Sequence, residues 1–203
     1  MPTERTGIGV LAISGSLRRH SFNRRLLDAC TGTAPVGMEL VMHDTIADIP
    51  LFNEDLEESA DAPHGVRRLR DSVAAADGLL IATPEYNQSL PGALKNAIDW
   101  LSRPDGNGAA VLDGKPVAIM GATTGAWGTR IAQSQLRHAL AATGAMTLPA
   151  PMLFIRDAAH AYDVVTESYD QETRDRLHSF LSAFTSWIRL SMPRPSQSTR
   201  WTR

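Results

Sequence analysis

A run of small polar residues follows an apolar segment near the N-terminus. Ile8 to Ile13 is apolar and rich in β-branched residues; serines follow at 14, 16 and 21, together with Arg18 and Asn23, and no acidic side chain lies between 14 and 23. An apolar helical pattern comes next and is predicted to span 22–31. Hydroxyl groups, an arginine and the N–H groups of a helix start together favour a phosphate dianion. The alternative is an ordinary strand–helix turn with solvated polar residues, and the loop alone leaves both open.

Strand and helix patterns alternate along the chain and predict one α/β domain over residues 1–192. Helices are expected at 22–31, 66–76, 91–102, 129–143 and from 170 onward, and strands at 8–13, 38–42, 78–83, 116–120 and 146–153. Pro149 and Pro151 interrupt the last strand, which places it at an edge of the sheet. Such alternation predicts right-handed βαβ units and a parallel sheet covered on both faces. Residues 44–58 are expected to form a long surface connection, and 193–203, rich in Pro, Ser and Arg, a disordered tail.

Composition limits the partners that the chain should have. Of its 203 residues, 43% are hydrophobic and 21% are charged, with a formal net charge of −2. This balance gives no reason to expect nucleic acid or a membrane as partner. The chain has no apolar run of membrane-spanning length and no signal-peptide pattern, and its single Cys30 cannot form an internal disulfide. A cytoplasmic location is therefore expected, and the scattered histidines predict no metal site.

Three segments with unusual chemistry follow predicted strands. These are residues 14–21, 84–90 and 121–128. Ligands of parallel sheets bind at the carboxyl ends of strands, so the three segments are expected to meet there. Pro84 fixes the chain and donates no hydrogen bond, and Tyr86 offers a flat apolar face with a polar tip. Their convergence is stronger evidence for a ligand site than any one loop.

Two motifs resemble those of the NADPH-dependent FMN reductase family. They are Ser14-Gly15-Ser16-Leu17-Arg18, and Pro84-Glu85-Tyr86-Asn87 followed by the stretch from Pro91 to Trp100. The resemblance covers roughly residues 7 to 190 in element order. It implies a flavodoxin-like, doubly wound, five-stranded parallel sheet of order 2-1-3-4-5 with helices on both faces. It also implies FMN and NADPH as cofactors and a homodimer or homotetramer.

The family also implies roles for residues of the three loops. The phosphate of FMN would be held by Ser16, Arg18, Ser21 and Asn23. The isoalloxazine would be lined by Pro84 to Asn87, with Thr123 to Gly125 near the ring or the ribityl chain. The full set of expected cofactor-binding residues is Ser14, Ser16, Arg18, Ser21, Phe22, Asn23, Pro84, Glu85, Tyr86, Asn87, Thr123, Thr124 and Gly125.

The leading functional hypothesis is an enzyme that takes hydride from NAD(P)H onto FMN and reduces a small-molecule acceptor. The family includes chromate, quinone and azo-dye reductases, and free flavin is a further plausible acceptor. No side-chain nucleophile is required, so no catalytic residue is assigned, and ping-pong kinetics are expected if one open flavin face serves both substrates. The alternative is a flavodoxin-type FMN electron carrier without NAD(P)H turnover. Such carriers tend to be strongly acidic, whereas this chain is nearly neutral.

Three side chains allow more than one interpretation. Glu85 could line the flavin, or it could be a solvated loop carboxylate or an ion-pair partner of a neighbouring subunit, and the structural role is favoured. Trp127 could cover the flavin or fill the gap beneath its loop. Ala93, Ala97 and Trp100 form a second apolar stripe beside the core-facing stripe of their helix, which could meet a partner subunit or pack within its own chain. The oligomeric tendency of the family favours the partner subunit.

Overall fold

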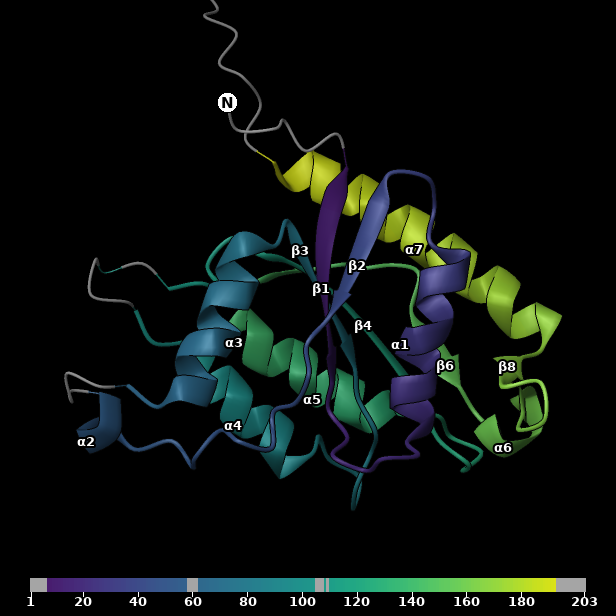
Figure 1. The fold of residues 1–203 in the computed structure, drawn as a ribbon, viewed down its shortest axis with the longest axis horizontal. Helices are drawn as coiled ribbons and strands as arrows, with labels where there is room; N and C mark the ends of the chain where they lie inside the picture. Colours follow the sequence, from purple (N-terminus) through teal and green to yellow (C-terminus); the bar gives the residue numbers. More distant parts are fainter. Residues whose placement is uncertain (1–6, 58–61, 105–107, 109, 193–203) are drawn as a thin grey trace, which may run out of the picture.

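Three strands of near-continuous apolar sequence, at residues 8–14, 78–82 and 116–122, form the centre of a parallel sheet (Figure 1). The computed structural model describes residues 7–57, 62–104, 108 and 110–192, so the tail predicted at 193–203 lies outside them. The strands are β1 (Ile8–Ser14), β2 (Met38–Met42), β3 (Gly78–Ala82), β4 (Pro116–Ala122), β5 (Met146–Thr147) and β6 (Leu153–Ile155). Their order is β2-β1-β3-β4-β5, with β6 also paired to β4, and all these pairs are parallel. The predicted flavodoxin-like order is confirmed.

The predicted fifth strand is two short strands. β5 pairs with Pro116 and Val117 at the start of β4, and β6 pairs with its end. Prolines 149 and 151 lie between the two strands, where they cannot donate to the ladder. Both strands lie at the β4 edge, as the prolines predict.

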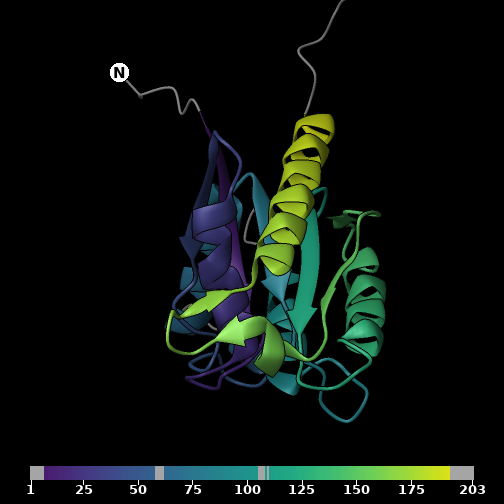
Figure 2. The same ribbon diagram turned by 90° about the vertical axis from the view of Figure 1, so that its right-hand side faces the viewer.

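Helices cover both faces of the sheet (Figures 1 and 2). One face carries α1 (Phe22–Thr33) and α7 (Gln171–Ser191), and the other carries α3 (His64–Ala75), α4 (Gly92–Leu101) and α5 (Arg130–Ala141). Side chains alternate along β1, so that Val10 and Ala12 join the core under α1 and α7, whereas Leu11 and Ile13 join the core under α3, α4 and α5. Burial on both faces explains why β1, β3 and β4 are apolar almost throughout.

The smaller elements lie beside the main layers. These are α2 (Glu54–Glu57), α6 (Ala158–Ala161) and the antiparallel hairpin of β7 (Tyr162–Asp163) with β8 (Ser168–Tyr169). The hairpin contacts α1 through Tyr169, whose hydroxyl donates to the Phe22 carbonyl at 2.9 Å. The segment between β6 and α7 therefore supports the start of α1.

The expectation that the second stripe of α4 meets a partner subunit is wrong for Trp100. Its side chain is buried in its own chain, its Nε1 donates to the Pro50 carbonyl at 2.8 Å, and its ring meets Phe52 edge-on at 5.0 Å between centroids. The connection after β2 is thus not only a surface segment, because Ile46 and Ile49 are buried there too. The prediction of a homodimer or homotetramer then rests on the family resemblance alone.

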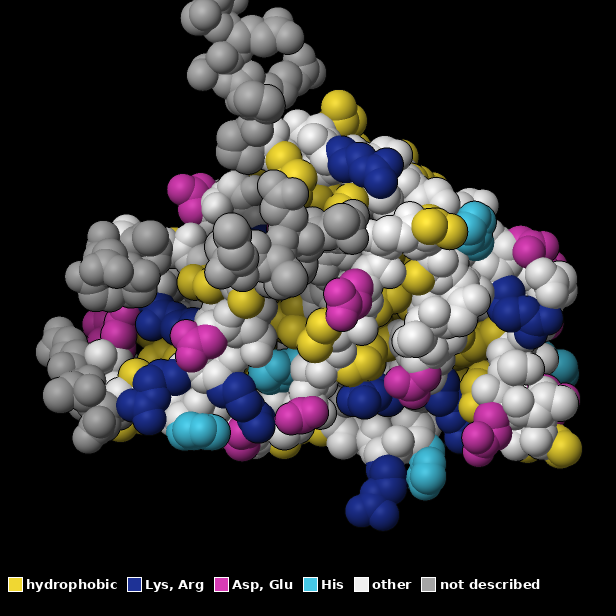
Figure 3. All heavy atoms as spheres, turned by 45° about the horizontal axis from the view of Figure 1, so that its top comes forward, with side chains coloured by type: hydrophobic (Ala, Val, Ile, Leu, Met, Phe, Trp, Pro, Cys, Tyr) yellow, Lys and Arg dark blue, Asp and Glu magenta, His cyan; other side chains and the backbone are white. Residues whose placement is uncertain are grey.

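The surface carries charges of both signs. On the face shown in Figure 3, basic and acidic side chains are interspersed, without a broad field of one sign. Within the part of the chain that the structure describes, no helix is long and apolar enough to cross a membrane.

Candidate functional site

Three loops leave neighbouring strands at one edge of the sheet. Ser14 at the end of β1 pairs with Ala82 at the end of β3, and Ala82 pairs with Met120 near the end of β4. The strands therefore end close to the same level. We call the segments that follow them the first loop (residues 15–21), the second loop (83–91) and the third loop (123–129).

Hydrogen bonds join the three loops, either directly or through the residues next to them. The Ser16 hydroxyl lies 3.3 Å from the Tyr86 hydroxyl, which connects the first loop with the second. Asn23, at the start of α1, bonds with its side-chain amide to both backbone groups of Ala122, where β4 ends, at 2.9 Å each. The predicted convergence of the loops is thus present, and the loops are held by specific hydrogen bonds.

The first loop is built around hydroxyl groups. The Ser14 hydroxyl donates to the Ser16 carbonyl at 3.1 Å and accepts from the Ser16 N–H at 3.3 Å. Ser21 caps α1, and its hydroxyl accepts from the Asn23 N–H at 3.2 Å. Among the described residues, no acceptor lies in hydrogen-bond range of the N–H groups of Leu17 and of residues 19 and 20. These N–H groups stay available for an anion.

The side chains of Phe22 and Asn23 contact other residues of the chain. The Phe22 ring meets Tyr162 of the β7–β8 hairpin edge-on at 6.3 Å between centroids, and Arg25 lies over both rings. Both polar atoms of the buried Asn23 amide are engaged by Ala122. The family resemblance implied Asn23 as a phosphate ligand. One of the two Nδ2 N–H groups and the Oδ1 atom are engaged by Ala122, and the residue is only 2% exposed, which favours a structural role.

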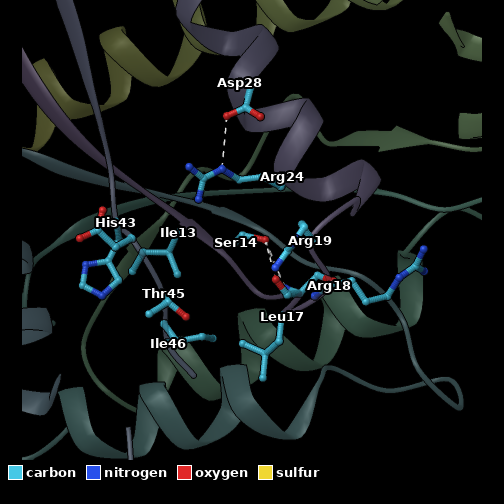
Figure 4. A pocket seen from close by; sticks show the side chains of 12 residues that line it. Ile13, Ser14, Leu17, Arg18, Arg19, Arg24, Asp28, His43, Thr45 and Ile46 are labelled. Atoms are coloured by element: carbon cyan, nitrogen blue, oxygen red, sulfur yellow. Dashed lines mark hydrogen bonds and ion pairs between the residues drawn. The ribbon is translucent and has the colours of Figure 1, made fainter. Parts of the chain in front are cut away.

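A cavity of about 400 Å³ opens beside the first loop (Figure 4). Arg18 and Arg19 lie on one side of it, opposite His43 and Ile13, and Arg24 reaches in from α1. Arg24 is paired with Asp28 at 3.3 Å, so its charge is partly compensated. The carboxylate of Asp44 also lines the cavity, so three arginines face two carboxylates and the lining keeps a net positive charge, in keeping with an anionic ligand there.

Buried His43 belongs to the wall of this cavity. Its pKa lies below the ordinary value, first because burial disfavours the charged form and second because the Arg68 cation lies nearby. Its Nε2 is buried without a hydrogen-bond partner in the described part of the chain. The imidazole therefore favours the neutral form, and the exposed guanidinium groups supply the positive charge of the cavity.

A tight turn shapes the second loop. The N–H and carbonyl groups of Tyr86 and Ser89 bond reciprocally at 3.0 Å, and Asn87 and Gln88 between them have φ values of 51° and 57°. Two successive positive φ values indicate a type I′ turn, a conformation that asparagine tolerates better than most residues. The turn presents Tyr86 with its side chain 43% exposed.

Side chains and N–H groups of helix α5 hold the second loop in place. Glu85 Oε2 accepts from the N–H groups of Ile131 and Ala132 at 2.9 and 3.0 Å. These N–H groups belong to the first turn of α5, where the helix itself offers them no acceptor. Gln135, one turn further on, accepts from the Ser89 hydroxyl at 2.6 Å and donates to the Gln88 carbonyl at 3.2 Å. Glu85 therefore has a structural role, but it caps α5 of its own chain and is neither a solvated loop carboxylate nor held by a neighbouring subunit. The sequence did not single out Gln135, because the only pattern in that segment is the helical spacing of its apolar residues.

The third loop is anchored at one end and exposed at its centre. Thr123 donates its N–H to Ile155 and accepts from the N–H of Ala158, while Thr124 and Gly125 are exposed. Trp127 is 82% exposed, which excludes the interpretation that it fills a gap beneath the loop.

The donor set of the three loops suits FMN. The first loop offers hydroxyl groups, N–H groups and Arg18 to a phosphate, without a carboxylate among residues 14–23. In the second loop the N–H groups of Glu85 and of residues 87 and 88 have no acceptor among the described residues, so they can face the carbonyl edge of a flavin. The Glu85 carboxylate is held by α5 and leaves this edge to the N–H donors.

A family model decides the assignment. The model of the NADPH-dependent FMN reductases matches residues 8–160, which include all three loops. The chain belongs to the NADPH-dependent FMN reductase family. FMN and NADPH are the cofactors that this membership implies, and the chain is an oxidoreductase of the NAD(P)H-dependent FMN and quinone reductase group. An enzyme is thereby favoured over an electron carrier.

Several family members are similar along almost their whole length. An NAD(P)H-dependent FMN reductase of Pseudomonas aeruginosa is 43% identical over 182 residues, which are 90% of this chain and 96% of that protein. A 2-hydroxy-1,4-benzoquinone reductase of a Burkholderia species is 40% identical, over 89% of this chain and 96% of its own. The solved structure of the flavoenzyme FerB, an NAD(P)H:(acceptor) oxidoreductase of Paracoccus denitrificans, aligns with a TM-score of 0.81 and 37% identity, and covers 91% of this chain and 98% of its own.

Proposed function

We propose that this family member transfers hydride from NADPH to an FMN held by the three loops and then reduces a quinone. The observation that carries the proposal is the joining of the loops, above all the 3.3 Å contact of the Ser16 and Tyr86 hydroxyls, which links the phosphate end of the site to its ring end. Two similar proteins named for quinone reduction, from a Burkholderia species and from Escherichia coli, each 40% identical, support a quinone as acceptor. Chromate, azo dyes and free flavin are the acceptors to compare with it.

Each loop has its own part in binding. Ser14, Ser16, Arg18 and Ser21 would hold the phosphate through hydroxyl groups and charge-assisted hydrogen bonds. Pro84 to Asn87 would line the ring, with Tyr86 as a flat wall and the backbone N–H groups along its edge. Thr123 to Gly125 would face the ring or the ribityl chain. Phe22 and Asn23 would position the first loop through Tyr169 and Ala122.

Bound FMN supplies the hydride chemistry, and the chain supplies position and electrostatics. Tyr86 is 43% exposed and the centre of the third loop is exposed too, which supports a ring site that is open to solvent. Nicotinamide and quinone would then use the same side of the site in turn. We therefore propose ping-pong kinetics, in which oxidised nicotinamide leaves before the quinone binds.

An absorbance spectrum of the purified protein tests the proposal. We expect a flavin spectrum that NADPH bleaches under anaerobic conditions and that 1,4-benzoquinone restores. If neither NADPH nor NADH bleaches the flavin, the enzyme proposal fails and the electron-carrier alternative returns. Initial rates at varied NADPH and quinone should give parallel double-reciprocal lines, whereas intersecting lines would contradict the shared face.

Two variants of one residue separate the roles of Tyr86. Tyr86→Ala removes the flat wall, so the KM values of NADPH and of quinone should change together while a slower enzyme remains. Tyr86→Phe keeps the ring and loses only the contact with Ser16, so both KM values should stay close to those of the wild type. A change in only one KM value would contradict a common binding face.

A further inference from the structure

A second cavity borders the third loop on the side of β6 and α7. Its volume is about 720 Å³, and the later residues of the third loop, from Ala126 to Gly128, form part of its wall. The opposite wall comes from Phe154 of β6 and from residues of α7. Gly128 has a φ of 70°, and a Cβ there would lie 3.0 Å from the Phe154 side chain, so the loop packs closely against β6. One loop thus borders both the proposed flavin site and this cavity.

Positive charge gathers in this second cavity. Arg130, Arg156 and Arg176 line it, together with one carboxylate, Glu172, in a chain whose formal net charge is −2. The three arginines come from three elements: the start of α5, the residue after β6, and α7. Their convergence is a product of the fold and has no counterpart in the sequence as a basic run.

The guanidinium groups are not neutralised by carboxylates of the described chain. Arg130 lies over the Phe154 ring at 4.6 Å, and Arg176 Nη2 donates to the Phe154 carbonyl at 2.8 Å. No hydrogen bond or ion pair within the described residues involves Arg156. Arginine forks of this kind match the geometry of phosphate oxygens.

Trp127 adds an aromatic surface to the basic cavity. Its side chain is 82% exposed, so both the ring and the neighbouring guanidinium groups are accessible to a ligand. A flat ring beside arginines is the combination that binds a nucleotide, because the base stacks on the ring and the phosphates pair with the guanidinium groups. The cavity therefore suits a base with more than one phosphate group.

We propose that this cavity binds the adenosine half of NADPH, with adenine on Trp127 and the 2′-phosphate and pyrophosphate on the three arginines. The proposal rests on the proposed function, because the nicotinamide half must reach the flavin site across the third loop. A dinucleotide needs a second region for its adenosine when its nicotinamide occupies the ring site, and the shared loop makes the two regions neighbours. Glu172 can accept from a ribose hydroxyl. The arginines then make the enzyme prefer NADPH to NADH.

Calorimetric titration of the FMN-loaded protein with nicotinamide-free probes tests the cavity apart from the reaction. Adenosine 2′,5′-bisphosphate should bind more tightly than adenosine 5′-monophosphate. Arg156→Ala should weaken the bisphosphate by at least roughly tenfold, because charge-assisted hydrogen bonds to a phosphate are lost, and should affect the monophosphate less. Arg189→Ala, an exposed arginine of α7 outside the cavity, is the matched control and should leave both affinities unchanged.

Substitutions of the ring complete the experiment. Trp127→Ala should weaken both probes to a similar extent, and Trp127→Phe should restore most of the loss, because stacking does not depend on the 2′-phosphate. Equal affinity of the wild type for the two probes, or no binding of the bisphosphate, would overturn the proposal. An unchanged bisphosphate affinity in Arg156→Ala would overturn the proposal as well. If light scattering also shows that this variant has a lower molar mass than the wild-type protein, the cavity belongs to a contact with a second copy of the chain.

The failure of the cavity proposal and that of the proposed function give different results. If NADPH bleaches the flavin but the bisphosphate does not bind, the adenosine half lies elsewhere and the reductase function stands. If no nicotinamide nucleotide bleaches the flavin, the reductase function fails whatever the bisphosphate does.

Discussion

The side chain of Asn23 holds both backbone groups of Ala122. Its Nδ2 donates to the Ala122 carbonyl and its Oδ1 accepts from the Ala122 N–H, each at 2.9 Å, and the bond joins the start of α1 to the end of β4. The two residues lie 99 positions apart in the sequence. A single buried amide thus fixes the start of α1, which follows the first loop, against the end of β4, which precedes the third loop.

Asn23→Leu should destabilise the protein. It leaves the buried N–H and carbonyl of Ala122 without partners, at a cost of about 1–3 kcal/mol for each group. Asn23→Asp keeps an acceptor for the N–H but places a buried carboxylate against the Ala122 carbonyl, so it should also be destabilising. Urea unfolding measures both, and FMN titration should show weaker binding in parallel. An unchanged unfolding midpoint with weakened FMN would instead indicate that the amide contacts the phosphate directly.

Arg18→Ala should weaken FMN by at least roughly tenfold and leave riboflavin unchanged. The lost interaction is a charge-assisted hydrogen bond to the phosphate, which is worth about 1.5–3 kcal/mol. Arg19→Ala is the matched control from the same loop and should have a smaller effect. Fluorescence titration of the three apoproteins measures their affinities for FMN and for riboflavin. Equal affinity of the wild-type protein for FMN and riboflavin would remove the phosphate assignment of the first loop.

Glu85→Ala should destabilise α5 and the second loop together. The carboxylate satisfies two N–H groups in the first turn of α5, and loss of such a cap costs about 0.5–2 kcal/mol. Glu85→Gln keeps an acceptor oxygen and should cost less. Chemical unfolding gives both values. If Glu85→Gln has an unchanged unfolding midpoint but no longer lets NADPH bleach the flavin, the residue acts on the reaction and not as a cap.

Gly121→Ala should be strongly destabilising. A Cβ at this position would lie 2.0 Å from the Thr129 hydroxyl and 2.5 Å from the Thr83 carbonyl, so the end of β4 must shift, at a cost of roughly 1–3 kcal/mol or more. The double variant with Thr129→Ala relieves only the first contact. Thr129→Ala alone is the reference, because it also loses the hydrogen bond that Gln133 Nε2 donates to the Thr129 hydroxyl at 3.0 Å. Relative to this reference, thermal unfolding should show partial recovery, and full recovery would contradict the role of the Thr83 backbone.

His43 should make the protein less stable in mild acid. Burial, and then the Arg68 cation, lower its pKa in the folded state, so the unfolded state binds the proton first. The stability that neutral His43 contributes is present above its unfolded pKa of about 6.5 and decreases as the pH falls through that value. Unfolding midpoints of His43→Gln should fall less between about pH 7.5 and 5.5 than those of the wild type, while the exposed His64→Gln should follow the wild type. Identical slopes for wild type and His43→Gln would refute the assignment.

The sequence by itself determines the strands, the helices and the loops that carry the ligand chemistry. Apolar period and loop composition are local properties, and the handedness of βαβ units then brings loops after successive strands to one edge of the sheet. The first and second loops could therefore be found from residues 14–21 and 84–90, together with the family that they resemble. Glycine and proline positions also indicate where strands end, as Pro149 and Pro151 do for the last one.

Only the tertiary structure decided which groups bond to one another. Asn23 looked like a phosphate ligand, yet it binds Ala122; Trp100 looked available to another subunit, yet it donates to Pro50. The basic cavity beside Trp127 likewise needs α5, β6 and α7 to be in place. A sequence shows that a buried polar group or an apolar ring must have a partner, because leaving it without one is costly. Which partner it finds depends on packing between segments far apart along the chain, and local patterns do not contain that information.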